Sequence, residues 1–398
     1  MNIAKSNAHI QAETTFISII FAVSCGHFLN DVMQSMLPAI YPILRENYGL
    51  TFLQIGIITA VYQLTGSILQ PIIGFYTDKQ PSPYSLPCAS AATMIGLLLL
   101  ANAHHYYILL IGSAFVGLGS SIFHPEASRV ARLASGGKYG FAQSIFQVGG
   151  NCGSAIGPII AALFISQQQR IGWLSFLAFF GIIILFFVSR WYANNLKRRL
   201  TKKSVSQENR LPKAKVRNAI FVLVGLMFAK YVYMASMQNY YMFYTMEKFG
   251  ISLHQAQLLL FLYLGGIAVG TIFGGPIGDR VGARTVIWVS ILGVFPFTVI
   301  LPFVSLPLTA ILTVIIGVIL ASAFPAIVVF AQELMPGKVG TVAGLFFGLS
   351  FGIGALSSAA LGRVMDLIGS QAMFEICSYM PLLGLIAVFL PKIRTSHT

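Results

Sequence analysis

Ionisable side chains inside long apolar stretches are the residues of this sequence that could do chemistry, and Asp31 is the clearest of them. It lies mid-way along such a stretch, with His27 four residues before it and Gln34 three after it, so the three share one helical face. A charge at the centre of a bilayer costs about 2.5–3.5 kcal/mol, and such residues therefore usually face a cavity or a partner. We predict that Asp31 binds a proton; the alternative is a packing network between helices.

A second ionisable residue, Lys230, begins a helical face that continues through Tyr233 and Tyr241. An ammonium group in an apolar stretch attracts an anionic group of a substrate, and the tyrosine hydroxyls would add hydrogen-bond donors. We expect Lys230 and Asp31 to face each other across a wet central cavity. The alternatives are that Lys230 only neutralises Asp31 or extends to the membrane interface, and that the tyrosines only pack.

The segment 106–133 carries two polar faces, because residues two apart on a helix differ in direction by about 200°. His124 lies on one face, and Glu126 and Arg129 lie on the other. Both faces could reach one cavity only if Pro125 kinks the helix. Glu126 and Arg129 could form a pair that holds an inner gate, or Glu126 could carry a proton while Arg129 binds the anion. His124 is either a second proton site or a satisfied buried histidine.

Amides and glycines complete the candidate site. Gln147 and Asn151 lie four residues apart on one helical face, and they could hydrogen-bond a substrate or a neighbouring helix. Gly153, Gly157 and Pro158 allow close helix packing and bending. The predicted substrate ligands are Lys230, Arg129, His27, Asn30, Gln34, Gln147, Asn151, Tyr233 and Tyr241.

The elements that must position these residues are transmembrane helices. The 398 residues are 56% hydrophobic and 9% charged, far below the roughly 25% charged residues of a soluble domain. Unbroken apolar runs such as 181–188 do not alternate as the strands of a membrane β-barrel do. The composition therefore predicts an all-α, multi-pass membrane protein.

The net charge of +14 does not indicate nucleic-acid binding. Ten of the 25 basic residues fall between Arg190 and Arg217, which fits a cytoplasmic linker beside anionic lipid. The four cysteines are scattered in apolar surroundings without a CxxC spacing, so we expect neither a disulfide framework nor a metal site from them. No P-loop motif is present, so ATP-driven transport is not expected.

We predict twelve transmembrane segments, because about 20 apolar residues cross a bilayer. They are 15–44, 51–77, 84–103, 106–133, 140–165, 171–191, 218–246, 252–278, 284–303, 307–332, 340–364 and 372–391. Most basic residues outside these segments fall on the side that holds both termini. The positive-inside rule then places both termini in the cytoplasm.

The two halves of the chain match at an offset of about 200 residues. Residues 49–54 correspond to 250–255, and 137–140 correspond to 337–340. Two parallel repeats of six helices are the plan of a transporter with a central site. The expected division is an N-terminal bundle at 1–190, a basic cytoplasmic linker at 191–217 and a C-terminal bundle at 218–398.

Two short motifs resemble the major facilitator superfamily. The loop Gly275-Pro-Ile-Gly-Asp279-Arg280-Val-Gly282-Ala-Arg284 is similar to the loop signature of that family, and Gly74-Phe-Tyr-Thr-Asp78-Lys79 keeps its glycine and aspartate. Span five carries Gly153-Ser-Ala-Ile-Gly157-Pro158, similar to a motif of drug/proton antiporters. The family's antiporter arginine in span four is replaced by Ser113, so the general drug-pump assignment does not transfer.

A narrower resemblance, to the fosmidomycin resistance protein family, covers nearly the whole chain. It is carried by four motifs: His27-Phe-Leu-Asn30-Asp31, Phe123-His124-Pro125-Glu126-Ala-Ser128-Arg129-Val-Ala-Arg132, Ser144-Ile-Phe-Gln147-Val-Gly-Gly-Asn151 and Lys230-Tyr231-Val-Tyr233-Met-Ala-Ser236. The resemblance implies a proton-coupled antiporter of the bacterial inner membrane that exports small anionic phosphonates such as fosmidomycin or fosfomycin. Uptake of an organophosphate or other organic anion, or broader multidrug export, is the alternative.

The resemblance also implies which residues would act. Protons would be carried by Asp31, Glu126 or His124. The cytoplasmic gate would comprise Asp78, Lys79, Asp279, Arg280 and Arg132, with Arg132 or Arg129 as partner of Asp78. We expect a monomer in the lipid bilayer that is not an enzyme, whose partners are the anionic substrate and protons, and that needs no cofactor, metal or nucleic acid.

Overall fold

A computed structural model describes residues 15–50, 52–165, 167–201 and 212–391 of the chain, and every regular element in these ranges is a helix. Apolar segments of this length form helices because a helix satisfies its backbone hydrogen bonds internally, as a lipid surrounding requires. The predicted all-α class is confirmed.

The first half of the chain forms one helical bundle. Its elements are α1 (Ile17–Ala39), α2 (Tyr41–Tyr48), α3 (Phe52–Lys79), α4 (Ser85–Ala101), α5 (Tyr106–Ala134), α6 (Tyr139–Phe164), the 3-10 helix η1 (Gln168–Leu174) and α7 (Ser175–Thr201).

The second half forms a matching bundle. Its elements are α8 (Lys213–Phe249), α9 (Leu253–Val281), α10 (Ala283–Ile291), α11 (Phe295–Ile300), η2 (Leu301–Phe303), α12 (Leu306–Ala321), α13 (Ala323–Leu334), α14 (Val339–Ile368), α15 (Ser370–Ser378) and η3 (Met380–Phe389).

These elements correspond to the twelve predicted segments, although several segments are interrupted. In the described part of the chain, 10 helical stretches are long and apolar enough to cross a membrane, and α4 and α6 match the two remaining segments. The predicted linker at 191–217 is helical at both ends, because α7 continues to Thr201 and α8 begins at Lys213. Residues 202–211, the middle of the linker, lie outside the described residues.

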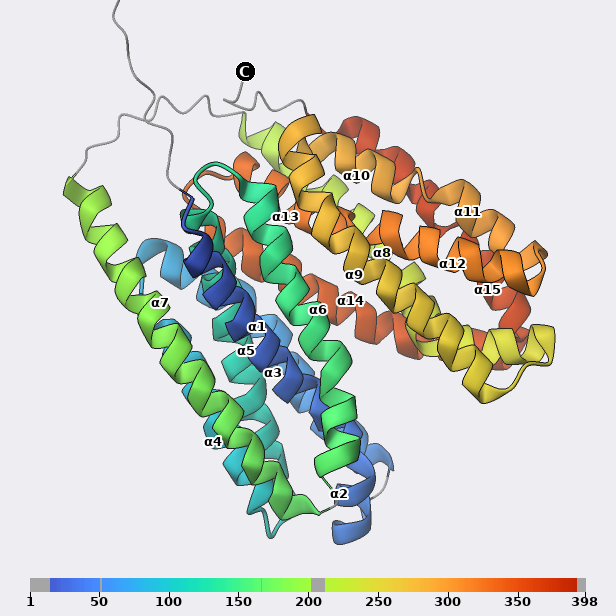
Figure 1. Ribbon diagram of the computed structural model, residues 1–398, viewed down its shortest axis with the longest axis horizontal. Helices are drawn as coiled ribbons and strands as arrows, with labels where there is room; N and C mark the ends of the chain where they lie inside the picture. The colour runs from blue at the N-terminus through green and yellow to red at the C-terminus, as the bar shows by residue number, and fades with distance from the viewer. Residues whose placement is uncertain (1–14, 51, 166, 202–211, 392–398) are drawn as a thin grey trace, which may run out of the picture.

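The two bundles lie together at one end and diverge from it (Figure 1). α3 packs against α14, and α6 packs against α9. The start of α1, the end of α7 and the start of α8 lie at the same end of the molecule, which we call the linker end (Figure 1).

Aspartates close the two bundles together at the linker end. Asp78 at the end of α3 accepts hydrogen bonds from the backbone N–H groups of Gly340 (2.9 Å) and Thr341 (2.7 Å), at the start of α14. Asp279 at the end of α9 accepts two bonds from the start of α6 in the same way, at 2.7 and 2.8 Å. Each carboxylate satisfies N–H groups that a helix N-terminus leaves unpaired. The two bundles are therefore joined at the linker end.

Candidate functional site

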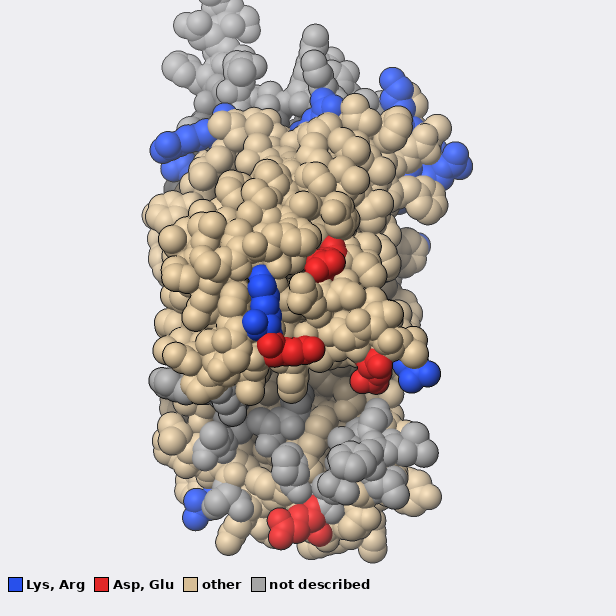
Figure 2. All heavy atoms as spheres, turned by 90° about the vertical axis from the view of Figure 1, so that its right-hand side faces the viewer, with Lys and Arg blue, Asp and Glu red and all other residues tan. Residues whose placement is uncertain are grey.

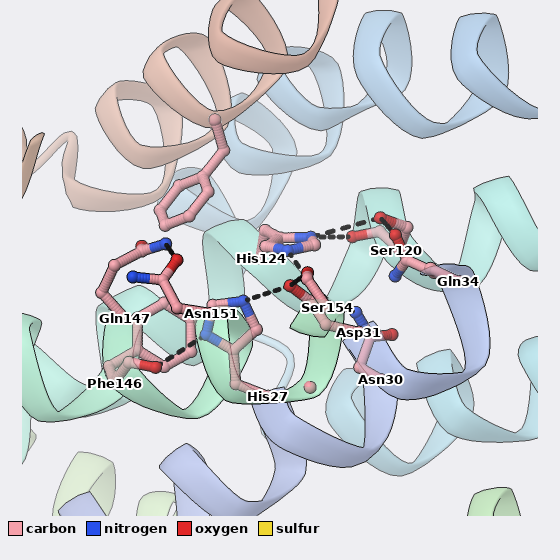
Figure 3. Close-up of polar contacts among 12 residues, drawn as sticks. His27, Asn30, Asp31, Gln34, Ser120, His124, Phe146, Gln147, Asn151 and Ser154 are labelled. Carbon is pink, nitrogen blue, oxygen red and sulfur yellow. Dashed lines mark hydrogen bonds and ion pairs between the residues drawn. The ribbon is translucent and has the colours of Figure 1, made fainter. Parts of the chain in front are cut away.

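A cluster of two histidines and one aspartate lies where α1, α5 and α6 meet (Figure 3). His27 Nε2 is 3.4 Å from one carboxylate oxygen of Asp31, and His124 Nε2 is 3.6 Å from the other. All three residues are buried, Asp31 at 8% exposure and both histidines at 1% or less. Asn30 and Ser154 donate further hydrogen bonds to the carboxylate, at 3.0 and 3.3 Å. The sequence predicted His27 beside Asp31 from helical spacing, whereas His124 arrives from another helix.

Backbone carbonyls fix the orientation of both imidazole rings. His27 Nδ1 lies 2.8 Å from the carbonyl oxygen of Phe146, and His124 Nδ1 lies 2.9 Å from that of Ser120. A carbonyl only accepts, so each Nδ1 carries the hydrogen and donates it. In the neutral rings, both Nε2 atoms then direct a lone pair at the Asp31 carboxylate. Only a cation, either a proton or a metal ion, could make these contacts attractive.

Glycines let α6 approach the cluster closely. A Cβ atom on Gly150 would collide with the imidazole of His27 and with the Asp31 carboxylate. A Cβ on Gly153 or Gly157 would collide with α1, so these residues permit the close packing of α6 on α1. The described backbone of α6 runs continuously through this region. The side chain of Pro158 lies outside the described side chains.

Asp31 opens onto a cavity of about 230 Å³. This first cavity is lined by Asp31, Gln34, Ser35, Tyr62, Gln63, Gly66, Ser120, Ser154 and Phe351. Gln34 accepts hydrogen bonds from Tyr62 (2.8 Å) and Ser120 (3.0 Å). Phe351 belongs to α14, so the first cavity lies between the two bundles.

A second cavity, of about 460 Å³, lies between α3, α8 and α14 and shares Gln63 with the first. Its lining is Thr59, Gln63, Tyr231, Met234, Ala235, Gln238, Asn239, Gly354, Ala355, Ser358 and Ala359. The described lining of the two cavities together holds many amides and hydroxyls and a single formally charged residue, Asp31. The two cavities are therefore polar, and their described lining contains no cation.

Lys230 does not line either of the two cavities, so the structure does not bring it to face Asp31 across them as expected. Lys230 is buried, and within the described part of the chain it forms no ion pair. Its Nζ lies 5.3 Å from the ring centre of Tyr231 and 5.5 Å from that of Phe324. Phe324 in turn contacts Phe347, and Phe347 contacts His124. Phe324 and Phe347 of the second bundle therefore lie between Lys230 and the His124 ring that contacts Asp31. Helical spacing within one segment does not reveal this arrangement.

The face of α8 that follows Lys230 points into the core of its own bundle. Tyr233 and Tyr241 are fully buried among apolar residues, and the Tyr241 hydroxyl lies 2.5 Å from that of Thr313. Cavity residues of α8 come instead from the neighbouring face that includes Tyr231 and Gln238. The polar residues Gln238 and Asn239 were the signal in the sequence that could have identified this face.

The other face of α5 forms a buried charge cluster near the linker end. Arg129 binds Asp78 at 2.6 Å and lies 3.3 Å from Glu126. It also donates hydrogen bonds to the carbonyl and hydroxyl oxygens of Thr77. The two faces of α5 therefore serve different places, with His124 at the cavity and Arg129 at the contact between the bundles near the linker end. α5 is helical throughout, including Pro125.

Other predicted gate residues contribute unequally. Arg132 donates a 3.2 Å hydrogen bond to Gln332 of the second bundle and stacks on Tyr139. Lys79 lies over the ring of Phe75, and both Lys79 and Arg280 are exposed. Arg129 is a partner of Asp78.

The amides predicted on α6 bond to each other and across the bundles. Gln147 donates to Asn151 at 3.3 Å (Figure 3), and Asn151 donates to Thr271 of α9 at 3.2 Å. Neither amide lines the two cavities described above.

Comparisons with known proteins show which family shares this architecture. The family model of the Major Facilitator Superfamily matches residues 23–246 and 220–398. The chain is 51% identical over 386 residues, 96% of this chain and 95% of the relative, to the Fosmidomycin resistance protein of Escherichia coli (strain K12). It is 40% identical over 393 residues, 97% and 96% of the two chains, to the uncharacterized MFS-type transporter YfnC of Bacillus subtilis (strain 168).

Solved structures show the same fold. The transporter FucP in its outward conformation superposes with a TM-score of 0.71 at 16% identity, covering 94% of this chain and 100% of FucP. The human organic anion transporter MFSD10 (TETRAN) superposes with a TM-score of 0.72 at 17% identity, covering 94% and 99%. Two matching bundles, a polar space between them and a family match over almost the whole chain agree, so the chain belongs to the major facilitator superfamily and is a transporter, not an enzyme.

Proposed function

We propose that this protein exports small anionic phosphonates across the bacterial inner membrane in exchange for protons. The observation that carries the proposal is its 51% identity, over nearly its whole length, to a fosmidomycin resistance protein. The buried carboxylate of Asp31 at the wall of the inter-bundle cavity supports coupling to an ion.

The charge distribution supports a cytoplasmic location of the linker end and of both termini. Most lysines and arginines visible in Figure 2 gather at its upper end, which is the linker end, and the acidic residues lie lower. Arg190, Lys213 and Arg217 belong to the helix ends that flank the linker. Cytoplasmic segments of membrane proteins carry this excess of basic residues.

The closed linker end supports alternating access in which Asp78, Asp279 and Arg129 form the cytoplasmic gate. The bonds of Asp78 and Asp279 join the two bundles, and Arg129 supports Asp78. These bonds must break when the cytoplasmic side opens. Arg132 adds a bond across the same interface. We assign Arg129 to this gate rather than to the substrate, because Asp78 and Glu126 already engage it.

The cavities supply the proposed path of the substrate. Asp31, with His124 beside it, is the proposed coupling residue, and Glu126 is an alternative carrier deeper at the gate. Gln34 is the predicted substrate ligand that lines a cavity. Lys230 lies directly before Tyr231, which lines the second cavity, so its ammonium places positive charge behind that wall.

Everted membrane vesicles test the proposal. With an imposed proton gradient, the parent should accumulate fosmidomycin, and collapse of the gradient should stop accumulation. Asp31→Asn should abolish gradient-driven accumulation, whereas the control Asp366→Asn, on an exposed residue of α14, should behave as the parent.

Two outcomes would contradict the proposal. Gradient-driven accumulation in right-side-out vesicles instead of everted ones would indicate uptake. If Asp31→Asn and Lys230→Ala both transport like the parent, the site assignment is wrong, although the family and fold stand.

A further inference from the structure

The histidine–aspartate cluster has the spacing of a metal site. One ring nitrogen of His27, one of His124 and a carboxylate oxygen of Asp31 all lie within 4.8 Å of one another. Ligands at about 2.0–2.2 Å from a tetrahedral zinc ion lie about 3.3–3.5 Å apart. His27 Nε2 and His124 Nε2 lie 3.4 and 3.6 Å from the two different oxygens of the Asp31 carboxylate, so a rotation of the carboxylate and small shifts of the rings would let one oxygen and both nitrogens hold such an ion.

The surroundings of the cluster match those of metal-binding histidines. A metal-ligating histidine usually donates its other ring N–H to a carbonyl or carboxylate, and this hydrogen bond fixes the ring. Both rings here have that bond, from Nδ1 to the carbonyl of Phe146 or Ser120. Asn30 and Ser154 in turn hydrogen-bond the Asp31 carboxylate.

One of the three proposed ligand atoms is an unpaired polar atom. His124 Nε2 is fully buried and has no hydrogen-bond partner among the described residues. An unsatisfied buried polar atom costs about 1–3 kcal/mol. Its lone pair points at a carboxylate oxygen, a repulsive contact that a cation between the two would make favourable.

We propose that His27, Asp31 and His124 bind one divalent transition-metal ion of the zinc class. Two imidazole nitrogens and one carboxylate oxygen are three protein ligands, as in zinc sites that keep a fourth position open. Asp31 lines the first cavity, so a small molecule there has access to that fourth position.

A bound ion would also explain how an anion enters two cavities whose described lining contains no cation. A phosphonate in the two cavities meets the negative Asp31 and otherwise neutral lining groups. A divalent ion reverses the local charge, and a phosphonate oxygen is a suitable fourth ligand. The exported species would then be a metal–phosphonate complex, an assignment that rests on the proposed function. Metal and protons would exclude each other, because the ligands bind metal in their deprotonated form.

Metal binding is measured on the full chain purified in detergent at one pH near 8. Cobalt(II) serves as the spectroscopic probe, and zinc(II) is counted by equilibrium dialysis. We expect one ion per chain, with the visible absorption of tetrahedral cobalt, and at least a tenfold weaker affinity in His27→Gln and in His124→Gln. The matched control His105→Gln, on an exposed histidine outside the cluster, should bind like the parent.

The metal site is overturned if the parent binds no ion, or if the cluster variants bind as tightly as the parent. If a cluster variant fails to fold, thermal unfolding of the parent still tests the metal site. Zinc should raise the unfolding temperature of the parent and of His105→Gln, because an ion that binds only the folded state stabilises it. The absence of such a rise in the parent would also contradict the proposal.

Fosmidomycin binding with and without zinc separates the metal proposal from the proposed function. Binding that strengthens at least tenfold with zinc supports the metal–phosphonate complex. Equal binding in both conditions overturns that complex. Zinc binding without fosmidomycin binding in either condition overturns the phosphonate function and leaves the metal site standing.

Discussion

Two regions at equivalent places in the two bundles differ sharply in chemistry. α5 and α12 begin at Tyr106 and Leu306, and α6 and α14 begin at Tyr139 and Val339, so both pairs are offset by 200 residues. At this offset, five polar residues of the first half correspond to apolar residues of the second half. The pairs are His124 with Phe324, Glu126 with Ala326, Arg129 with Val329, Gln147 with Phe347 and Asn151 with Phe351.

The two sets of residues contact each other across the interface. The His124 ring lies 5.1 Å from that of Phe347 and 5.4 Å from that of Phe351. The first bundle therefore carries the histidine–aspartate cluster, and the second bundle covers it with aromatic rings. The two halves share one arrangement of helices, but the residues at these matching positions differ in chemistry. We expect substitutions at paired positions to have unequal effects.

Arg129 and Val329 should differ most. Arg129→Met leaves Asp78 and Glu126 buried without their cation, and breaking a buried pair in this way costs about 3–5 kcal/mol. Val329→Ala removes two methyl groups and should cost about 1–2 kcal/mol. Unfolding in detergent measures both. The double variant Arg129→Met with Glu126→Gln should recover part of the loss; no recovery would show that Glu126 is not held by Arg129.

Asp31 should be next in effect, and its loss should appear in transport rather than in folding. Asp31→Asn keeps the shape of the side chain but removes the charge, and we expect gradient-driven flux to fall by about 100-fold, about 2.7 kcal/mol. Val232, one residue beyond the 200-residue offset, is the paired position, and Val232→Ala should keep flux within about threefold. Equal flux defects in the two variants would remove the special role of the first half.

The gate aspartates make two similar contacts. Asp78 accepts bonds from two backbone N–H groups, the Thr341 hydroxyl and Arg129, and Asp279 accepts bonds from two backbone N–H groups at the start of α6. Asp78→Asn and Asp279→Asn should each destabilise the closed linker end by about 2 kcal/mol. Labelling of a cysteine placed at the linker end reports the opening. No opening in either variant would show that the two aspartates do not hold the linker end closed.

The aromatic cover should give the smallest effect. Phe347→Leu keeps an apolar side chain but removes the ring contact with His124, worth about 0.5–1.5 kcal/mol. We expect a drop of about 1 kcal/mol in unfolding free energy and flux within about tenfold of the parent. A loss of flux as large as that of Asp31→Asn would show that the second bundle takes part directly in coupling.

The sequence by itself determined the helical class, the two repeats and the acidic residue at the cavity. Hydropathy is decisive here because a lipid-exposed backbone must be helical, and the spacing of His27, Asp31 and Gln34 is fixed within one helix. The gate aspartates could also be found, because they end helices in both repeats at one offset.

Only the tertiary structure decided which helices meet and which face of each helix looks inward. It brought His124 to Asp31, turned Arg129 to Asp78 and put Phe324 and Phe347 on the path between Lys230 and the cluster. It also turned the predicted tyrosine face of α8 into its own bundle. The physical reason is that periodicity fixes the angle between residues of one helix, whereas the rotation of that helix against its neighbours depends on packing with segments far away in the chain.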